Sequence, residues 1–362
     1  MTTLFQKNID QIVPYEPGKP IEEVQRELGL KEIIKLASNE NPLGVSAKVV
    51  AGLQKKAASV FLYPDGSAWK LKKKLAQHLK VRETQLVLGN GSNEIIEFMA
   101  RGFLKDGRSV LTSQYAFLVY PLLTQVYGGS LVTVPMKDFR FDLDAMAKKI
   151  NSNVRLIFIA NPNNPTGTYV TKKELETFLK KVPADCMVCI DEAYFEFTQE
   201  KDYPNGLDFI NKGNVVVLRT FSKAYGLAGL RIGYGVANER VAKYLNKIRQ
   251  PFNVNTLAQE AACLALQDKT FLKNTQKTVW QGKKVYYDAF KAMRLNYISS
   301  QANFVLVDVG TDAQNVFKEC LKLGVIIRSM KAYGLDQYIR ISVGKARDNQ
   351  KCIQALKQVL NH

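Results

Sequence analysis

Short runs of apolar residues recur through the middle of the chain, and most are followed by a stretch with helical spacing. We predict strands at residues 86–88, 109–112, 130–134, 156–160, 187–190, 215–219 and 233–236. Their apolar residues are nearly continuous rather than alternating, which is typical of strands that helices cover on both faces. Strands that alternate with helices form a mainly parallel sheet. The pattern therefore predicts an α/β fold with a doubly wound, seven-stranded sheet.

The flanking segments predict helices and a smaller α+β unit. We expect a short helix at 22–28, after an irregular arm that contains prolines, and an amphipathic helix with Ser67 as its N-cap. Further helices are expected within 259–291 and at 315–323, and further strands at 304–309, 325–328 and 338–343. The resulting division is an arm with part of the small domain (1–40), a large domain (41–268) and a small α+β domain (269–362).

Composition indicates an ordinary globular protein, with 46% hydrophobic and 23% charged residues among 362. The apolar runs are far shorter than the ~20 residues of a membrane span, and the N-terminus lacks the apolar segment of a signal peptide. Five cysteines, an odd number, are typical of a reducing compartment. We therefore expect a cytoplasmic protein without a membrane partner.

The chain is strongly basic, with 51 Lys and Arg against 33 Asp and Glu, a net charge of +18. Such an excess suggests an anionic partner: nucleic acid, acidic lipid or a phosphorylated small molecule. The lysines are scattered in pairs and triplets rather than gathered in a tail. A solvated basic surface is therefore favoured over a nucleic-acid groove, which salt-sensitive binding to duplex DNA would reveal.

The sequence contains few residues that could form a metal site or a catalytic triad. There are only two histidines, His78 and His362, so neither a His-ligated metal nor a Ser-His-Asp triad is expected. Cys186 and Cys189 have Cys-x-x-Cys spacing but lie in an expected strand, where residues three apart face opposite sides. We expect two buried thiols there.

Polar residues follow several of the predicted strands, at the sheet edge where α/β proteins bind ligands. Ser92 and Asn93 open a helix after a Gly-Asn-Gly turn, and free N–H groups at a helix start favour an anion. Asn164 lies in Asn-Pro-Asn-Asn-Pro-Thr-Gly after another strand. Asp191 closes an apolar strand, where a carboxylate needs a cation or a donor. Each motif alone also fits a structural turn, a rigid loop or a helix cap.

A fourth motif follows strand 215–219. It holds the hydroxyls of Thr220 and Ser222, one lysine, Lys223, in a glycine- and alanine-rich setting, and Arg231 eight residues further on. This set suits a phosphate beside an amine nucleophile. A lysine, whose pKa is near 10.4 in water, must be activated to attack a carbonyl, and desolvation is one way to do so.

Together these motifs resemble aminotransferase class I/II among the fold-type I pyridoxal-phosphate enzymes, and within them they look like the histidinol-phosphate aminotransferases. The similarity runs from Leu-Ala-Ser-Asn-Glu-Asn-Pro at 36–42 to Ser-Val-Gly at 342–344. Asn-Pro-Thr-Gly, Asp-Glu-Ala-Tyr and Ser-Lys-x7-Arg occur in this order, each after a predicted strand. That combination is highly specific for the family.

The resemblance implies pyridoxal 5′-phosphate as cofactor. Lys223 would bind it covalently and later move a proton, and Asp191 would pair with the protonated ring nitrogen. Asn164 and Tyr194 would hydrogen-bond the ring oxygen. The phosphate would be held by Ser92, Asn93, Thr220, Ser222 and Arg231.

The resemblance also implies a homodimer, because Tyr63 matches a tyrosine that reaches the phosphate from the neighbouring subunit. An aromatic side chain should stack on the cofactor ring, and we expect Phe117, with Tyr115 as the alternative. Arg340 matches the arginine that grips the substrate carboxylate with its bidentate fork.

The implied reaction is amino transfer between glutamate/2-oxoglutarate and histidinol phosphate/imidazole-acetol phosphate. Arg328 and Arg340 would hold the substrate phosphate, with Tyr15 of the arm against the imidazole. An aromatic amino-acid or phenylpyruvate aminotransferase and a phosphothreonine decarboxylase are the alternatives of the same fold. They share every cofactor contact named above, so the motifs do not separate them.

Overall fold

A computed structural model gives the structure of the protein and describes residues 8–14 and 18–361. Its central element is a seven-stranded sheet in the order β2-β8-β7-β6-β5-β3-β4. The strands are β2 (Leu86–Gly89), β3 (Ser109–Ser113), β4 (Ser130–Val134), β5 (Val154–Ala160), β6 (Met187–Asp191), β7 (Val215–Thr220) and β8 (Gly233–Ala237). β8 is antiparallel to both neighbours, and all other pairs are parallel. The predicted fold class is confirmed.

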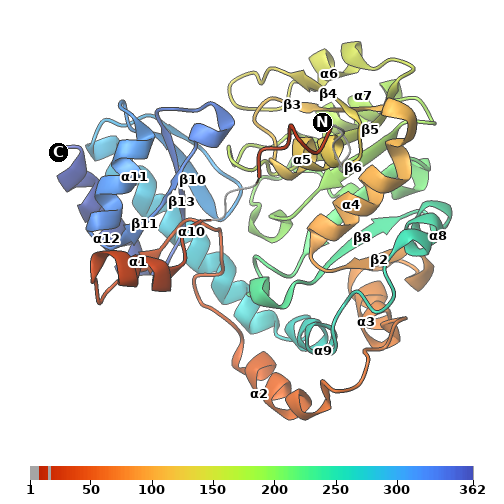
Figure 1. The fold of residues 1–362 in the computed structure, drawn as a ribbon, viewed down its shortest axis with the longest axis horizontal. Coiled ribbons are helices and arrows are strands. Elements are labelled where there is room, and N and C mark those ends of the chain that lie inside the picture. The colour runs from red at the N-terminus through yellow and green to blue at the C-terminus, as the bar shows by residue number, and fades with distance from the viewer. Residues whose placement is uncertain (1–7, 15–17, 362) are drawn as a thin grey trace, which may run out of the picture.

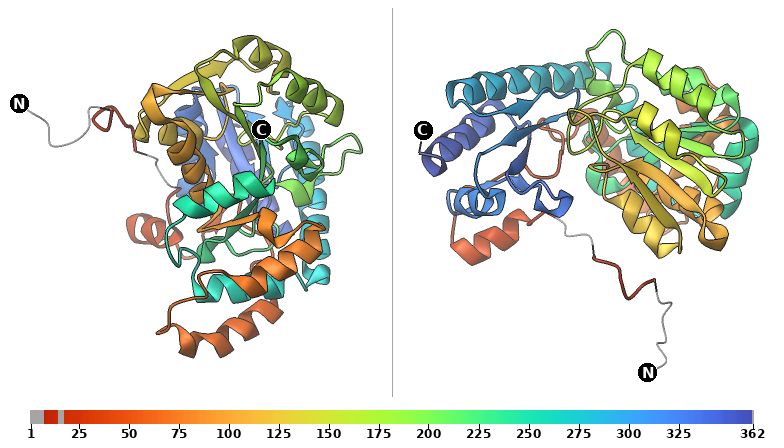
Figure 2. Two further views of the ribbon diagram at one scale, coloured as in Figure 1. Left: turned by 90° about the vertical axis from the view of Figure 1, so that its right-hand side faces the viewer. Right: turned by 90° about the horizontal axis from the view of Figure 1, so that it is seen from above.

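Helices cover both faces of this sheet, as Figures 1 and 2 show. α4 packs across β2, β5, β7 and β8. The helices of this part of the chain are α2 (Ala47–Lys56), α3 (Trp69–Leu79), α4 (Ser92–Phe103), α5 (Val119–Val126), α6 (Leu143–Lys149), α7 (Lys172–Lys181), α8 (Glu239–Ile248) and α9 (Thr256–Ala265). β4 departs from the expected burial on both faces, because it is an edge strand and is largely exposed until Val134.

The start of α3 differs from the prediction, because Ser67 is not its N-cap. The helix begins at Trp69, and the Asp65 carboxylate accepts the N–H groups of Ser67 (2.9 Å) and Trp69 (2.8 Å). Ala68 stands at the cap position with a φ of 50°. The tight turn brings an acceptor from further upstream within reach of the helix start.

A second, smaller unit has its own apolar core. Its four-stranded antiparallel sheet has the order β12-β13-β10-β9, and β1 pairs in parallel with β11. The strands are β1 (Ile34–Lys35), β9 (Tyr297–Ile298), β10 (Phe304–Asp308), β11 (Val325–Ile326), β12 (Arg328–Ser329) and β13 (Tyr338–Ser342). The helices are α1 (Ile21–Leu28), α11 (Ala313–Lys322) and α12 (Ala346–Val359).

The 24-residue helix α10 (Lys269–Ala292) joins the two units (Figure 1). Near its middle, Val279 packs in a cluster with Tyr194 and Phe197 of the large unit. Further along, Tyr286 and Phe290 belong to the core of the small unit. Within residues 8–14 and 18–361, no helix has both the length and the apolar content needed to cross a membrane.

Candidate active site

A cavity of about 180 Å³ lies between the two units, at the carboxyl ends of β5, β6 and β7. It brings together nearly all of the predicted site residues: Ser92, Asn93, Phe117, Asn164, Asp191, Tyr194, Thr220, Ser222, Lys223, Arg231, Arg328 and Arg340. Gly18, Ala37, Ser38, Asn39 and Tyr120 also line it. The ligand-binding edge expected of a parallel sheet is therefore the place where these side chains meet.

Lys223 follows β7 and points into this cavity. Its Nζ donates a hydrogen bond to the carbonyl oxygen of Ser38 (3.1 Å) and lies 5.9 Å from the centre of the Tyr194 ring. Burial, helped by the positive charge of Arg340, lowers the pKa of Lys223 from 10.5 to about 8. The amine is therefore closer to its neutral, nucleophilic form near neutral pH than an exposed lysine is.

Asp191 ends β6 and is buried. Its Oδ2 accepts the Tyr120 hydroxyl (2.8 Å), and its Oδ1 accepts the Ala193 N–H (3.2 Å). Burial raises the pKa of Asp191 to about 6, although the Tyr120 bond and the Lys223 charge oppose the change. The carboxylate can thus hold a protonated nitrogen of a ligand within the cavity.

Tyr120 is a site residue that the sequence analysis did not select. It lies in α5, one helical turn after Phe117, and is fully buried. A buried tyrosine hydroxyl needs a polar partner. The presence of a tyrosine in this apolar helix was therefore the one sign in the sequence that its hydroxyl meets a polar group. Its ring stacks on Phe158 of β5 at 4.4 Å, which fixes the direction of the hydroxyl.

Asn39 is a second residue that the analysis did not select. Its Nδ2 donates to the Tyr194 hydroxyl (3.0 Å), and its Oδ1 accepts the Ser342 hydroxyl (2.8 Å). Asn39 thereby ties the large unit to β13 of the small unit. The signal was its place in the 36–42 motif, whose residues received no individual role.

The five residues that are predicted to hold the cofactor phosphate all line the cavity: Ser92, Asn93, Thr220, Ser222 and Arg231. Arg231 Nη1 lies 3.5 Å from the Ser222 hydroxyl. Two glycines make room: a Cβ on Gly91 would lie 2.4 Å from Arg231 Nη2, and one on Gly233 would lie 2.4 Å from the Ser92 nitrogen. A helix start and a guanidinium around such a space suit a phosphate.

The structure distinguishes the two aromatic candidates. Phe117 lines the cavity and meets Tyr120 edge-on, with ring centres 5.7 Å apart. Tyr115 is not among the lining residues and packs against Phe139 at 6.2 Å. Phe117 is therefore the better placed to stack on a ring bound in the cavity.

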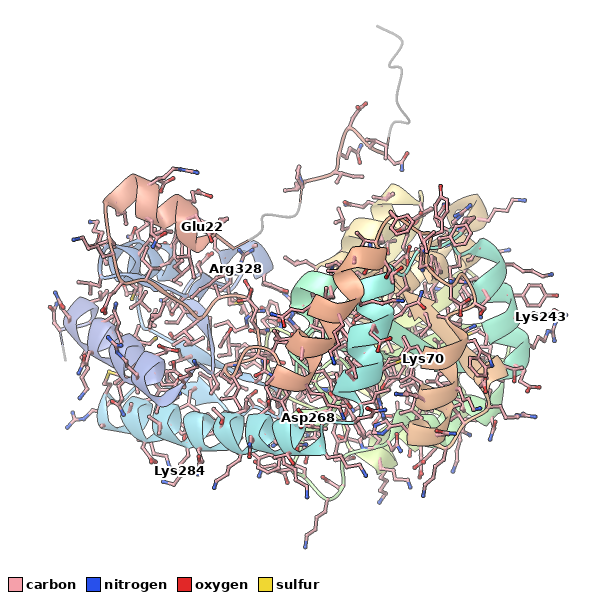
Figure 3. All side chains as sticks on the ribbon, turned by 90° about the horizontal axis from the view of Figure 1, so that it is seen from below. Glu22, Lys70, Lys243, Asp268, Lys284 and Arg328 are labelled. Atoms are coloured by element: carbon pink, nitrogen blue, oxygen red, sulfur yellow. The ribbon has the colours of Figure 1, made fainter. Side chains whose placement is uncertain are left out.

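Two arginines face the cavity from the small unit. Arg328 and Arg340 are directly opposite each other on the antiparallel strands β12 and β13, so their side chains leave the same face of the sheet. Figure 3 labels Arg328 in that unit. Arg340 donates to the Asn164 side chain and to the carbonyl oxygen of Ala37 (2.7 Å). Like charges in such a pair repel each other, so an anion between them would be stabilising.

Two predicted residues lie elsewhere. Tyr63 does not line the cavity of its own chain; its side chain is 84% exposed and stacks on Phe252 at 4.9 Å. Tyr15 lies outside the described residues.

Cys186 and Cys189 are buried and free, and the described residues contain no group of His, Cys, Asp and Glu that could hold a metal ion.

Comparisons with known proteins agree with this geometry. A family model described as aminotransferase class I and II matches residues 31–356. The chain is similar to a histidinol-phosphate aminotransferase of Moorella thermoacetica, with 46% identity over 351 residues, 96% of this chain and 91% of the relative.

Two solved structures are also similar. The histidinol-phosphate aminotransferase of Sinorhizobium meliloti, in complex with pyridoxal-5′-phosphate, has a TM-score of 0.92 and 29% identity over 100% of this chain and 98% of its own. The L-threonine-O-3-phosphate decarboxylase of Porphyromonas gingivalis has a TM-score of 0.80 and 25% identity, over 91% of this chain and 100% of its own.

Proposed function

Since the chain belongs to the class I and II aminotransferases, we propose that it transfers an amino group between glutamate and histidinol phosphate with pyridoxal 5′-phosphate as cofactor. The observation that carries this proposal is one buried cavity in which an activated amine, a buried carboxylate and a pair of arginines converge. The predicted alternatives share the cofactor contacts, and the arginine pair does not separate them. The 46% identity over 96% of the chain to a histidinol-phosphate aminotransferase favours histidinol phosphate.

The residues present fit this cofactor. Its phosphate suits the surroundings of Arg231, where Gly91 lets the guanidinium and Gly233 lets the start of α4 approach more closely than a Cβ would allow. Phe117 and Asp191 both line the cavity; Phe117 would cover the ring and Asp191 would meet the ring nitrogen. When bound, the cofactor supplies an electron-withdrawing ring that stabilises negative charge on the substrate carbon.

The protein's own groups then direct the proton movements. Lys223 Nζ, with its lowered pKa, can take the proton from the substrate α-carbon and return it. The Asp191 carboxylate holds a proton on the ring nitrogen, because a buried anion strongly favours a cationic partner. Tyr194 and Asn164 would hydrogen-bond the ring oxygen, and Asn39 donates a hydrogen bond to the Tyr194 hydroxyl.

Substrate choice is assigned to the arginine pair. Arg340 would bind the carboxylate of glutamate, and Arg328 with Arg340 would bind the phosphate of histidinol phosphate. Tyr15 is retained as the residue against the imidazole. Both substrates are anions, in keeping with the two cations at the cavity.

Three further assignments belong to the same proposal. The enzyme acts as a homodimer in which each subunit supplies Tyr63 to the other's phosphate pocket; the 84% exposure of this side chain supports that role. Residues 41–268 form the large, cofactor-binding domain, residues 269–362 the small α+β domain, and residues 1–40 the arm with part of the small domain. The enzyme acts in the cytoplasm.

The test is turnover of three substrates by the enzyme loaded with cofactor. With 2-oxoglutarate as acceptor, we expect histidinol phosphate to have a far higher kcat/KM than phenylalanine. We expect no release of carbon dioxide from phosphothreonine. A preference for phenylalanine would instead assign an aromatic aminotransferase, and carbon dioxide release would assign a decarboxylase. Lack of 2-oxoglutarate-dependent turnover of histidinol phosphate would refute the proposal.

A further inference from the structure

A short segment of the small unit, residues 299–302, runs between β9 and β10 and rests on the large unit. We name it the 299–302 strap. The N–H of Gln301 donates to the carbonyl oxygen of Gly167 (2.8 Å), and the Gln301 side chain accepts the N–H of Gln199 (2.9 Å). A Cβ on Gly167 would lie 2.2 Å from the Ser300 hydroxyl. The strap and the loop at Gly167 are therefore in direct contact.

The loop under the strap carries Asn164. Within it, the Gly167 N–H donates to the Asn163 carbonyl (2.7 Å), and the Asn163 N–H donates to the Thr168 carbonyl (2.8 Å). The side chain of Asn164 lines the cavity and accepts a hydrogen bond from Arg340. A displacement of Gly167 would thus be transmitted to a side chain placed to hydrogen-bond the cofactor.

Lys283 of α10 also contacts the strap. It is 4% exposed, and its Nζ donates to the carbonyl oxygen of Ser300 (2.6 Å). Burial lowers the pKa of Lys283 to about 8, opposed by the charge of Glu200. A buried ammonium is costly even when hydrogen-bonded, and an apolar side chain of similar length would fill the space without that cost. The lysine therefore suggests a role beyond packing.

We propose that Lys283 is a positioning residue for the active site: it fixes the 299–302 strap, and through Gln301 and Gly167 it fixes the loop that presents Asn164 to the cofactor. This inference rests on the proposed function, because Asn164 is its target. The contacts run from α10 through the strap to the cavity in three hydrogen-bonded steps. Lys283 itself does not line the cavity.

The test compares Lys283→Met and Lys283→Arg with Asn164→Ala in the holoenzyme. The measured quantity is the pH midpoint at which the visible absorption band of bound pyridoxal phosphate changes, because that midpoint responds to hydrogen bonds at the ring oxygen. We expect Lys283→Met to move the midpoint in the same direction as Asn164→Ala, by at least about half a pH unit. We expect Lys283→Arg to keep the midpoint close to the wild-type value. In Lys283→Met, kcat should fall about tenfold, with a smaller change in KM.

Lys284→Met is the matched control. This neighbour on α10 extends into solvent (Figure 3), 78% exposed, and pairs only with Asp288 among the described residues. It should leave the midpoint unchanged. If Lys283→Met lowers the melting temperature but leaves the midpoint at the wild-type value, Lys283 is merely structural and the proposal is overturned.

A second variant covers the case in which Lys283→Met does not fold. Gln301→Ala removes the side-chain contacts that hold the strap to Gln199 and Glu200, and it leaves α10 and the backbone bond to Gly167 in place. The loosened strap should move the midpoint in the same direction. An unchanged midpoint in Gln301→Ala would overturn the proposal too. A wild-type protein that binds no pyridoxal phosphate would contradict the proposed function instead, so the two failures are distinguishable.

Discussion

The Tyr120 hydroxyl donates a 2.8 Å hydrogen bond to Oδ2 of Asp191, and both side chains are buried in the cavity. This bond favours the ionised form of Asp191, whose pKa is nevertheless raised to about 6 by burial. A tyrosine from α5 and a carboxylate from β6 thus act as one unit. Its strength decides over which pH range Asp191 carries the charge that a protonated ring nitrogen needs.

Tyr120→Phe should raise the pKa of Asp191. The hydrogen bond from Tyr120 stabilises the carboxylate more than the neutral acid, so its removal favours the neutral acid. A hydrogen bond to a charged group is worth about 1.5–3 kcal/mol, so the shift should be about one to two pH units. Wild-type apoenzyme should lose affinity for pyridoxal phosphate as the pH falls through about 6. The variant should lose this affinity at a higher pH. Cofactor titrations at several pH values measure this.

Tyr127→Phe is the control for that prediction. Its hydroxyl also bonds a carboxylate, Glu97 (2.8 Å), but at an exposed site away from the cavity. Its pH dependence should match that of the wild type. Identical profiles for Tyr120→Phe and wild type would contradict the role of the bond.

Capture of pyridoxal phosphate by the apoenzyme should accelerate with pH, because attack on the aldehyde requires a neutral Lys223. The midpoint should lie near 8 rather than near 10.5. Removing the positive charge in Arg340→Ala makes the ammonium less unfavourable, so the midpoint should move up. Stopped-flow absorbance follows the reaction. Lys223→Ala should show neither capture nor turnover, whereas Lys284→Ala should behave as wild type.

The arginine pair should separate the two substrates. Arg340→Ala should raise KM for glutamate and for histidinol phosphate by about 10- to 100-fold, since a charge-assisted hydrogen bond contributes about 1.5–3 kcal/mol. Arg328→Ala should do so mainly for histidinol phosphate. Steady-state kinetics with each substrate are the measurement. Equal effects of Arg328→Ala on both substrates would mean that Arg328 attracts any anionic substrate and does not bind the phosphate specifically.

Tyr63 offers a test of the proposed dimer. Tyr63→Phe should weaken binding of pyridoxal phosphate although the side chain lies outside the cavity of its own chain. Mixing and refolding a Lys223→Ala subunit with a Tyr63→Ala subunit should restore activity, because the hybrid has one site with both residues. No gain over the separate variants would argue that Tyr63 does not act across an interface.

Stability should depend on a buried ion pair beside the cavity. Arg219 donates to the Glu192 carboxylate through Nε (2.9 Å) and Nη2 (2.8 Å), and both side chains are buried. Arg219→Met would leave that carboxylate buried without its cation, which costs about 3–5 kcal/mol of unfolding free energy. Lys284→Met, which breaks an exposed pair, should cost about 0.5 kcal/mol or less. Urea unfolding measures both.

The sequence predicted the central sheet and most of the site because those residues belong to local motifs. Asp191 and Lys223 each follow a recognisable apolar run, and the sheet topology brings such positions to one edge. The contacts of Tyr120 and Asn39 were beyond the same reasoning, since they join residues 71 and 155 positions apart. No periodicity or motif specifies which distant side chain meets which.

Smaller differences have local causes. The exposed face of β4 follows from its place at the edge of the sheet. An apolar run predicts a strand but does not show whether that strand is central or at an edge. The choice of Asp65 rather than Ser67 at the start of α3 depends on turn geometry. The sequence analysis preferred Phe117 but kept Tyr115 as an alternative, because their spacing does not give the direction of either side chain; only Phe117 lines the cavity.

The pairing of β1 also constrains how the protein is made. The N–H of Leu36 donates to Ile326 (2.7 Å), and its carbonyl accepts the N–H of Ser342 (2.8 Å). The ribosome produces residue 36 about 300 residues before these partners. The neighbouring wall of the cavity, residues 37–39, therefore gains these contacts only after residues 326 and 342 have been made. Vitamin B6 uptake would then wait until residue 342 has been made and has paired with residue 36.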